Sequence, residues 1–419
     1  ILNTEYSCML LSSLANKSIV FLGFEATNRS LYREARRRFP EQTFSIADKN
    51  DKHEIPDDPL LEAMLGPEYL SLLDDFDVIV RSPGVPYSVL PKRLRSRITT
   101  ATNLFFDEVR SKTSATIVGV TGTKGKSTTS TLICEVLKAT KRDALLLGNI
   151  DIQDWDAIEK VKNNTTIVYE MSSYMLEDFT ARPDIAVFLD IFPDHMDWHG
   201  SFENYLRAKS KITARQNTKD TFIYGGRFEP LKKIARTTKA KTVSLGELRG
   251  LHRDAEWFLD GDKKIFETSA VRILGAHNLD NVLAVLAVAR ELGIDADIVE
   301  GVVRSFSGLP HRLEFVAEKN GIKFYDDAIS TTHESTLSAI NTFNENLGGI
   351  ILGGFDRGYD FTALAKRLTE LRVPVIVLLP VSREKIEQAF NTLVVASSPS
   401  SGGGAEARGG GVINLLKAN

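Results

Sequence analysis

The segment Gly119–Thr129 (GVTGTKGKSTT) combines glycines, hydroxyl residues and lysines in a pattern that binds nucleotide phosphates. A strand-like apolar run precedes it and an amphipathic, helix-like run follows. Glycines would let backbone N–H groups close around phosphate oxygens, and the helix N-terminus would add partial positive charge. Lys126 would reach the terminal phosphates and Ser127 would ligate Mg²⁺. Val120 stands where the general pattern has its first glycine, yet the strand–loop–helix context predicts nucleotide binding rather than a turn with a solvated lysine.

Three other side chains could handle a metal ion or charge beside this loop. Glu170 closes the apolar run Thr166–Glu170, and His195 follows the next such run. Ligands of open α/β sheets collect beyond the carboxyl ends of strands, and Mg²⁺ takes carboxylate oxygens together with phosphates, so we expect Glu170 to face a metal. Lys209 falls in an expected helix over residues 202–215. Spacing alone predicts an ordinary structural role for His195 and an exposed position for Lys209.

The elements that would position these residues alternate between strand-like apolar runs and helix-like segments. This alternation is typical of the α/β fold class with mostly parallel sheets. Candidate linkers at Lys112–Ser114 and Gly308–Pro310 divide the chain into three domains, residues 1–113, 114–309 and 310–395, followed by a tail over residues 396–419. A long helix is expected over Asn278–Leu292. The expected strands are Ile19–Gly23, Thr43–Asp48, Asp77–Arg81, Thr116–Val120, Thr166–Glu170, Asp184–Ile191, Ile322–Asp326, Gly349–Gly353 and Val375–Leu379.

The composition excludes several classes of protein. The chain has 419 residues, with 52 Lys and Arg against 55 Asp and Glu, and a formal net charge of -3. This balance argues against a protein that binds mainly nucleic acid or anionic lipid. Two cysteines, Cys8 and Cys134, are too few for a disulfide scaffold. No apolar run approaches the roughly 18–20 residues that span a bilayer, and the run Cys8–Ala15 lacks a preceding basic residue, so we expect a cytoplasmic protein without membrane insertion.

Longer motifs of this chain resemble the ATP-dependent Mur ligase family. They are GTKGKSTT, the GNI of Gly148–Ile150, YEMSSYMLE, DHMDWHGSFENYLRAKSKI, GAHNLDNVLAVLA and GLPHRLEFV, and the resemblance covers residues 19–390. Two further segments, SPGVP at Ser82–Pro86 and ITTATNLFFDEV at Ile98–Val109, are most similar to the members that add D-glutamate to UDP-N-acetylmuramoyl-L-alanine.

The resemblance implies a fold and a reaction. The fold would comprise a Rossmann-like UDP-binding domain, a central P-loop ATPase domain with a mostly parallel sheet, and a C-terminal Rossmann-like domain that brings the amino acid. The enzyme would be an ADP-forming acid–amino-acid ligase of peptidoglycan precursor synthesis. The sequence leaves the oligomeric state open, and a monomer is favoured. ATP would convert the substrate's terminal carboxylate to an acyl phosphate, and the amine of D-glutamate would displace phosphate. Two Mg²⁺ ions would offset the charge of the transferred phosphoryl group.

The same resemblance assigns roles to individual residues. The catalytic residues would be Lys126, His195 and Lys209, with Lys209 carbamylated so that it can ligate Mg²⁺. The metal ligands would be Ser127, Glu170, His195 and Lys209. The residues that bind ATP would be Gly122, Thr123, Lys124, Gly125, Lys126, Ser127 and Thr128 in the loop, Asn278 and Asn281 near adenine, Arg312 at the phosphates and Asp327 at the ribose. The residues that contact the UDP-muramoyl substrate or the amino acid would be Asp48, Ser82, Gly84, Asn149, Ser172, Thr331 and Arg357.

Several positions depart from the family pattern, and they include Ile329 and Arg357 in the segments expected to hold the amino acid. The first loop, Gly23–Ser30, lacks the extra glycines that let a diphosphate approach. Residues 396–411 are rich in glycine and serine, which predicts a flexible tail that cannot supply the final strands of the third domain, so this domain would be incomplete. Two alternatives therefore stay open: a nucleotide-binding relative with weak or no ligase activity, and a sibling ligase that takes another amino acid.

Overall fold

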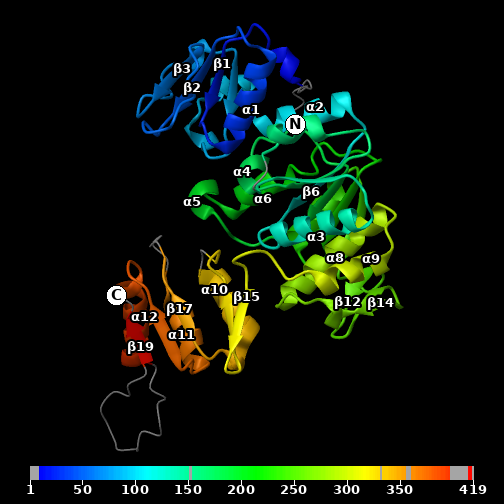
Figure 1. Ribbon diagram of the computed structural model, residues 1–419, viewed down its shortest axis with the longest axis vertical. Coiled ribbons are helices and arrows are strands. Elements are labelled where there is room, and N and C mark those ends of the chain that lie inside the picture. Colours follow the sequence, from blue (N-terminus) through cyan, green and yellow to red (C-terminus); the bar gives the residue numbers. More distant parts are fainter. Residues whose placement is uncertain (1–8, 151–152, 331–332, 355–359, 397–413, 418–419) are drawn as a thin grey trace, which may run out of the picture. The chain divides into compact units, whose positions relative to one another are not determined.

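The computed structural model of the protein describes residues 9–150, 153–330, 333–354, 360–396 and 414–417. The chain forms two compact units. The first comprises Ile1–Val271 and His277–Phe306, and the second comprises Arg272–Ala276 and Ser307–Asn419. Figure 1 traces the elements of each unit along the chain. Short 3-10 helices cover Leu11–Leu14, Leu73–Asp75, Tyr87–Val89, Lys92–Arg97, Trp155–Lys160, Thr268–Ala270 and Asn344–Asn346.

The first unit opens with a five-stranded sheet in the order β3-β2-β1-β4-β5, in which all neighbouring strands are parallel. Every residue of β1, β2 and β4 is buried, as expected for the near-continuous apolar runs of a parallel sheet. The carboxyl ends of these strands therefore share one edge. The strands are β1 (Ile19–Leu22), β2 (Phe44–Asp48), β3 (Leu61–Leu65), β4 (Val78–Arg81) and β5 (Ile98–Thr99), and the helices are α1 (Ala26–Arg38) and α2 (Ala101–Lys112).

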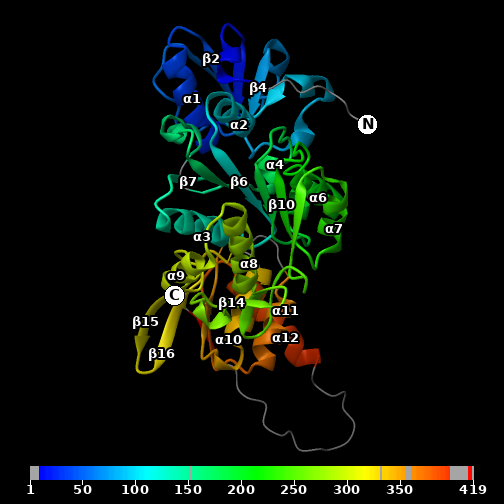
Figure 2. The same cartoon turned by 90° about the vertical axis from the view of Figure 1, so that its right-hand side faces the viewer.

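A six-stranded parallel sheet follows in the same unit, in the order β11-β10-β9-β6-β8-β7. Helix α3 packs against β6, β7 and β8, and α7 packs against β10 (Figure 2). The strands are β6 (Thr116–Thr121), β7 (Ala144–Gly148), β8 (Thr166–Glu170), β9 (Ile185–Phe188), β10 (Thr221–Gly225) and β11 (Lys241–Leu245). The helices are α3 (Lys126–Ala139), α4 (Ser173–Leu176), α5 (Met196–His199), α6 (Phe202–Ser210), α7 (Glu229–Thr237), α8 (Ala276–Glu291) and α9 (Ala296–Ser305).

A small antiparallel sheet, absent from the sequence-based expectations, completes the first unit. It consists of β12 (Leu251–Arg253), β13 (Trp257–Asp260) and β14 (Lys263–Glu267). Its buried residues include Phe258 and Phe266, which contact each other with ring centroids 4.9 Å apart. These strands are short and polar on their exposed positions, so they carry no long apolar run that would mark them in the sequence.

The second unit contains an antiparallel pair and a three-stranded parallel sheet. The pair is β15 (Glu314–Lys319) and β16 (Ile322–Asp326), and the sheet is β17 (Ile350–Leu352), β18 (Val375–Leu378) and β19 (Asn414–Lys417). Its helices are α10 (His333–Phe343), α11 (Thr362–Glu370) and α12 (Arg383–Ala396). An apolar core of its own, with Leu368, Ile376 and Leu378, lies between these helices and strands.

The structure confirms the α/β fold class with mostly parallel sheets. Asn414–Lys417 forms β19 and pairs in parallel with β18, a strand that was not among those expected. The sequence of these four residues is too short to indicate a strand, which depends on pairing with β18. The flexible segment was expected over residues 396–411, of which 397–411 lie outside the described residues. Among the residues that the structure describes, no helix combines the length and apolarity needed to cross a bilayer.

Candidate active site

The phosphate-binding loop predicted from the sequence lies between β6 and α3. It ends at Gly125, which caps the helix with φ +79°, in the left-handed region that favours glycine. A Cβ at Gly125 would meet Oδ1 of Asn281 at 2.2 Å. Asn281 lies on α8 and donates a hydrogen bond to Oδ1 of Asn278 (2.9 Å). The structure thus brings the two asparagines of α8 to the loop, and close packing excludes any larger residue at Gly125.

Lys126 is the first residue of α3, and its side chain folds back across the loop. Its Nζ donates hydrogen bonds to the carbonyl oxygens of Gly122 and Thr123, at 3.1 Å each. Burial lowers the pKa of the Lys126 ammonium. Ser127 and Thr128 follow in the same helical turn, whose N–H groups have no acceptor within the helix. The loop therefore presents a lysine and a helix N-terminus, the combination that binds anions.

Glu170 ends β8, the strand beside β6, and is 1% exposed. Its Oε1 accepts a hydrogen bond from the side-chain amide of Asn149, and its backbone carbonyl accepts the backbone N–H of Asn149, both at 3.0 Å. Gly148 permits this approach, since a Cβ there would lie 2.2 Å from the carbonyl oxygen of Glu170. The second oxygen, Oε2, is buried without a hydrogen-bond partner among the described residues. Such an oxygen suits a cation, because an unpaired buried charge is costly.

Lys209 is buried on α6 with 1% exposure, so the exposed position predicted from spacing alone was wrong. Its Nζ donates hydrogen bonds to the carbonyl oxygen of Gly122 (2.7 Å) and to Oγ1 of Thr121 (3.2 Å). Burial, followed by the nearby charge of Lys126, holds the pKa of Lys209 well below its usual range. A lowered pKa favours the neutral amine, which is the nucleophilic form of a lysine.

His195 directly precedes α5 and adopts φ +56°. Its Nδ1 lies 2.9 Å from the hydroxyl oxygen of Tyr174 on α4, a contact that orients the ring. Burial lowers the pKa of His195 and favours the neutral imidazole, which is the form that ligates metals. The preceding residue, Asp194, lies 3.5 Å from Nζ of Lys124 in the loop.

Electrostatic coupling shows that these side chains share one region of the first unit. Glu170 acts on the pKa values of both Lys126 and Lys209, and the two lysines act in turn on the pKa of His195. For each of the three basic groups, burial is the larger effect and lowers the pKa. Four residues singled out in the sequence therefore come together around the loop.

Asp48, Ser82 and Gly84 lie at the carboxyl edge of the first sheet. Oδ2 of Asp48 accepts the N–H of Phe24 (2.7 Å). The N–H of Ser82 donates to the carbonyl oxygen of Leu22 (2.8 Å), and Oγ of Ser82 accepts the N–H of Gly84 (3.4 Å). The parallel strands thus bring these three residues to the same end of the sheet.

The other residues that were predicted to bind substrate or nucleotide each have different neighbours. Ser172 caps α4, with its Oγ accepting the N–H of Met175 (3.2 Å). In the second unit, Oδ1 of Asp327 accepts the N–H of Leu313 (3.0 Å), so Asp327 lies beside the segment that carries Arg312. Thr331 and Arg357, expected to contact substrate, lie outside the described residues.

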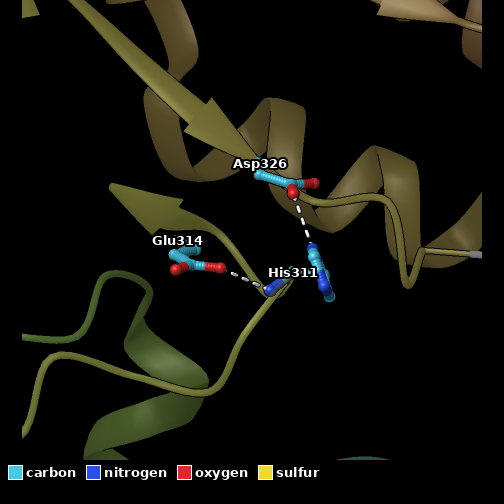
Figure 3. A group of neighbouring side chains, drawn as sticks. All are labelled: His311, Glu314 and Asp326. Atoms are coloured by element: carbon cyan, nitrogen blue, oxygen red, sulfur yellow. Dashed lines mark hydrogen bonds and ion pairs between the residues drawn. The ribbon is translucent and has the colours of Figure 1, made fainter. Parts of the chain in front are cut away.

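A compact group of His311, Glu314 and Asp326 lies in the second unit next to Arg312 (Figure 3). One potential ligand atom from each side chain lies within 4.8 Å of the others. However, Nδ1 of His311 is 2.7 Å from Oδ2 of Asp326, and Oε2 of Glu314 accepts the N–H of His311 (2.7 Å). The Asp326 carboxylate raises the pKa of His311. These contacts tie the loop before β15 to the end of β16, and they account for the clustering without a metal ion.

No sequence pattern indicated that two further residues, Asp190 and Tyr205, contact the phosphate-binding loop. Asp190 follows β9 and accepts hydrogen bonds from the backbone of the phosphate-binding loop. Tyr205, on α6, donates its hydroxyl to Oγ1 of Thr123 (3.1 Å). A single Asp after a strand and a Tyr within a helix have no diagnostic spacing, so only the fold reveals these contacts.

Comparison with known proteins identifies the class to which this site belongs. Residues 120–289 match the model of the Mur ligase middle domain. Over 404 residues the chain is 32% identical to UDP-N-acetylmuramoylalanine–D-glutamate ligase of Streptococcus pyogenes serotype M49 (strain NZ131), covering 92% of this chain and 87% of that ligase. The ligase of the same name from Halalkalibacterium halodurans is 32% identical over 389 residues, covering 89% of this chain and 84% of its own. The chain therefore belongs to the Mur ligase family, whose members are ATP-dependent ligases.

Solved structures agree with this assignment at the level of the fold. UDP-N-acetylmuramate-alanine ligase MurC from Thermotoga maritima has a TM-score of 0.56 at 19% identity, with 90% of this chain and 89% of that chain covered. MurF ligase from Thermotoga maritima, solved in complex with ADP, has a TM-score of 0.55 at 18% identity, with 96% and 91% covered. Both likenesses concern the fold alone. Among the sequence relatives, the two described above share one name, UDP-N-acetylmuramoylalanine–D-glutamate ligase.

Proposed function

We propose that this protein joins D-glutamate to UDP-N-acetylmuramoyl-L-alanine in peptidoglycan precursor synthesis and that the formation of the amide bond is coupled to the conversion of ATP to ADP and phosphate. The proposal rests on the 32% identity between this chain and two ligases that are named for this reaction. The observation that carries it is the position of Lys209, buried 2.7 Å from the carbonyl oxygen of Gly122 in the phosphate-binding loop. The amine of Lys209 lies directly against the phosphate-binding loop, and its lowered pKa favours a chemical role beside its two hydrogen bonds to the loop. We place the reaction in the cytoplasm and infer a monomer and the three-domain division described above.

ATP would lie with its phosphates at the N-terminus of α3. Lys126 would exchange its contacts with Gly122 and Thr123 for the terminal phosphates, and the N–H groups of Lys126, Ser127 and Thr128 would bind phosphate oxygens. Asn281 and Asn278 would face the adenine side. The resemblance also assigns Arg312 to the phosphates and Asp327 to the ribose.

The residues around the loop fit Mg²⁺, because Oε2 of Glu170 is buried and without a hydrogen-bond partner among the described residues. Ser127, Glu170, His195 and a carbamylated Lys209 would hold the ions. When bound, Mg²⁺ supplies positive charge that offsets the charge of the transferred phosphoryl group. Lys209 would gain its carboxylate when the neutral amine attacks CO₂ and loses a proton, and its lowered pKa supports that reaction. Carbamylation would thus convert the buried amine of Lys209 into a carboxylate whose oxygen atoms can ligate Mg²⁺.

UDP-N-acetylmuramoyl-L-alanine would bind with its uridine diphosphate along Asp48, Ser82 and Gly84. Its muramoyl group would lie near Asn149 and Ser172. Its terminal carboxylate attacks the γ-phosphorus of ATP and releases ADP. The amine of D-glutamate then attacks the acyl carbon, and phosphate leaves from the tetrahedral intermediate. Thr331 and Arg357 would hold the amino acid, with the arginine able to grip a carboxylate through two N–H groups.

Phosphate release tests this proposal. The protein is incubated with ATP, Mg²⁺ and UDP-N-acetylmuramoyl-L-alanine, and a panel of D- and L-amino acids is added one at a time. D-Glutamate is expected to raise phosphate release well above the rate with ATP alone, and Lys126→Ala is expected to abolish the increase. Turnover with a different amino acid would indicate a sibling ligase, and no turnover with any of them would contradict ligase activity.

A further inference from the structure

Asp190 contacts the phosphate-binding loop from the neighbouring strand. It lies two residues after β9, which pairs with β6 in parallel up to Thr121 and Phe188. Its Oδ1 accepts the backbone N–H of Thr123 at 2.6 Å and that of Lys124 at 2.9 Å. Its own carbonyl oxygen lies 3.2 Å from the same Thr123 nitrogen. One carboxylate oxygen therefore ties two consecutive residues of the loop.

The segment after Asp190 anchors the same half of the loop through a side chain. Oγ1 of Thr123 donates to the carbonyl oxygen of Phe192 and accepts the N–H of Phe192, both at 3.2 Å. The hydroxyl of Tyr205 adds a third contact at 3.1 Å. The first half of the loop is thus fixed by protein groups, and its N–H groups at Thr123 and Lys124 are already in use.

The second half of the loop is built differently. The N–H groups of Lys126, Ser127 and Thr128 belong to the first turn of α3 and have no acceptor within the helix. Gly125, between the two halves, takes the left-handed conformation that turns the chain into the helix. Any shift of Thr123 and Lys124 would move this turn and the N–H groups behind it.

We propose that Asp190 is a positioning residue for ATP: its hydrogen bonds to Thr123 and Lys124 hold the loop in the shape that presents the first turn of α3 to phosphate. This inference rests on the proposed use of ATP and concerns a residue that would act on the nucleotide through the loop. The role requires a hydrogen-bond acceptor at Oδ1 and does not require a negative charge. Burial raises the pKa of Asp190.

Substitutions at Asp190 separate hydrogen-bond acceptance from charge. Asp190→Asn keeps an acceptor oxygen at the same place and removes the charge, so its KM for ATP is expected to stay within about twofold of the wild-type value. Asp190→Ala removes both bonds to the loop and is expected to raise the KM for ATP about tenfold or more, with a smaller change in kcat. ADP affinity, measured by titration calorimetry without the other substrates, is expected to change in the same way.

Asp184 offers a matched control on the same pair of strands. Its Oδ2 accepts the N–H of Ile117 (2.7 Å) at the opposite end of β6, far along the strand from the loop. Asp184→Ala is expected to lower the unfolding midpoint while leaving the KM for ATP unchanged. A rise in KM for Asp184→Ala equal to that for Asp190→Ala would overturn the proposal, because it would reflect general loss of stability.

Two further results would overturn the inference. One is an unchanged ADP affinity in Asp190→Ala. The other is an equal loss of affinity in Asp190→Asn and Asp190→Ala, which would assign the effect to charge; the Asn variant decides this point even if the Ala variant does not fold. Failure of the ligase function is distinguishable, since wild-type protein that binds ADP without catalysing ligation leaves the role of Asp190 intact.

Discussion

At the scale of single residues, the site places the half-buried Lys126, the buried Lys209 and several acids around one loop. Lys126 and Lys209 both donate to the carbonyl oxygen of Gly122, and the charge of Lys126 helps to lower the pKa of Lys209. Such an arrangement destabilises the folded protein when no ligand compensates for it. The predictions at this scale concern how single residues change the stability of the folded protein and its binding of ATP.

Replacing Lys209 with Met removes a buried amine and keeps the length of the side chain. Because folding lowers the pKa of Lys209, the unfolded chain binds more protons between that lowered pKa and the unfolded value of about 10.4. Lys209 therefore costs stability at neutral pH, and this cost falls as the pH rises towards about 10.4. In CO₂-free buffer, we expect Lys209→Met to be more stable than wild type at pH 7, with a smaller difference at higher pH.

Urea denaturation of both proteins at several pH values measures this difference. A stability gap that does not change with pH would show that Lys209 is not buried as a neutral amine. The same variant is expected to lose ligase activity, and removal of bicarbonate from the wild-type assay is expected to lower the rate if Lys209 is carbamylated.

Gly125→Ala tests the close contact at the end of the loop. The new Cβ would lie 2.2 Å from Oδ1 of Asn281, in a left-handed backbone conformation that costs about 1–2 kcal/mol for other residues. We expect lower stability and a KM for ATP raised about tenfold or more. Gly246→Ala is the matched control, since Gly246 has φ +85° and open space around it. That variant should lose stability through the backbone alone and bind ATP normally; equal effects on ATP would contradict the role of the Asn281 contact.

At the scale of elements, a buried ion pair links the five-stranded sheet of the first unit to the segment that follows α4. Arg81, the last residue of β4, is fully buried and forms two hydrogen bonds to the carboxylate of Asp178, at 2.7 and 2.8 Å. A third bond runs to the carbonyl oxygen of Tyr174 (3.2 Å), the residue that orients His195. Arg81 immediately precedes Ser82. The ion pair between Arg81 and Asp178 therefore fixes the turn that is proposed to bind UDP-N-acetylmuramoyl-L-alanine.

Breaking this pair is expected to cost far more than breaking an exposed one. Asp178→Ala removes both carboxylate hydrogen bonds of the buried Arg81 guanidinium and leaves Glu177, 3.7 Å away, as its remaining acidic partner. A loss of up to about 3–5 kcal/mol in the free energy of unfolding is expected. Arg33→Ala removes a pair with Asp156 whose side chains are 57% and 42% exposed, and less than about 1 kcal/mol is expected. Urea denaturation compares the two, and similar losses would contradict the buried character of the Arg81 pair.

The sequence predicted the elements that carry their own signal. Strands such as Thr166–Glu170 are continuous apolar runs, and the convergence of strand ends was enough to place Glu170 on the edge of the sheet that carries the loop. His195 was assigned to the site only through the family resemblance. Lys209 and Asp190 could not be placed this way, because burial and contact depend on how α6 and β9 pack against β6. The strand β19 was missed for the same reason, since its pairing with β18 is a tertiary contact between distant segments.

At the scale of the whole molecule, the chain divides into two compact units with separate apolar cores. The first contains the phosphate-binding loop and the proposed metal residues, and the second ends in a strand contributed by the tail. A division of this kind allows one unit to lose stability without the other.

Truncation after residue 396 tests the contribution of β19. Without it, the N–H and C=O groups on one edge of β18 lose their partners, so amide hydrogens of Val375–Leu378 are expected to exchange faster with solvent. Amides of β6 and β8 in the first unit are expected to keep their protection. Truncation after residue 417 retains β19 and serves as the control. Unchanged exchange in β18 after the longer truncation would contradict the pairing.

The contacts of Lys126 have a consequence for the thermodynamics of nucleotide binding. Since its Nζ already rests on two carbonyl oxygens of the loop, the long side chain is ordered before ATP arrives. When ATP binds, Nζ of Lys126 exchanges these neutral carbonyl acceptors for charged phosphate oxygens. Because the side chain is already ordered, binding removes little further rotamer freedom. The affinity gained from this lysine should therefore appear mainly as favourable enthalpy, with only a small conformational entropy penalty.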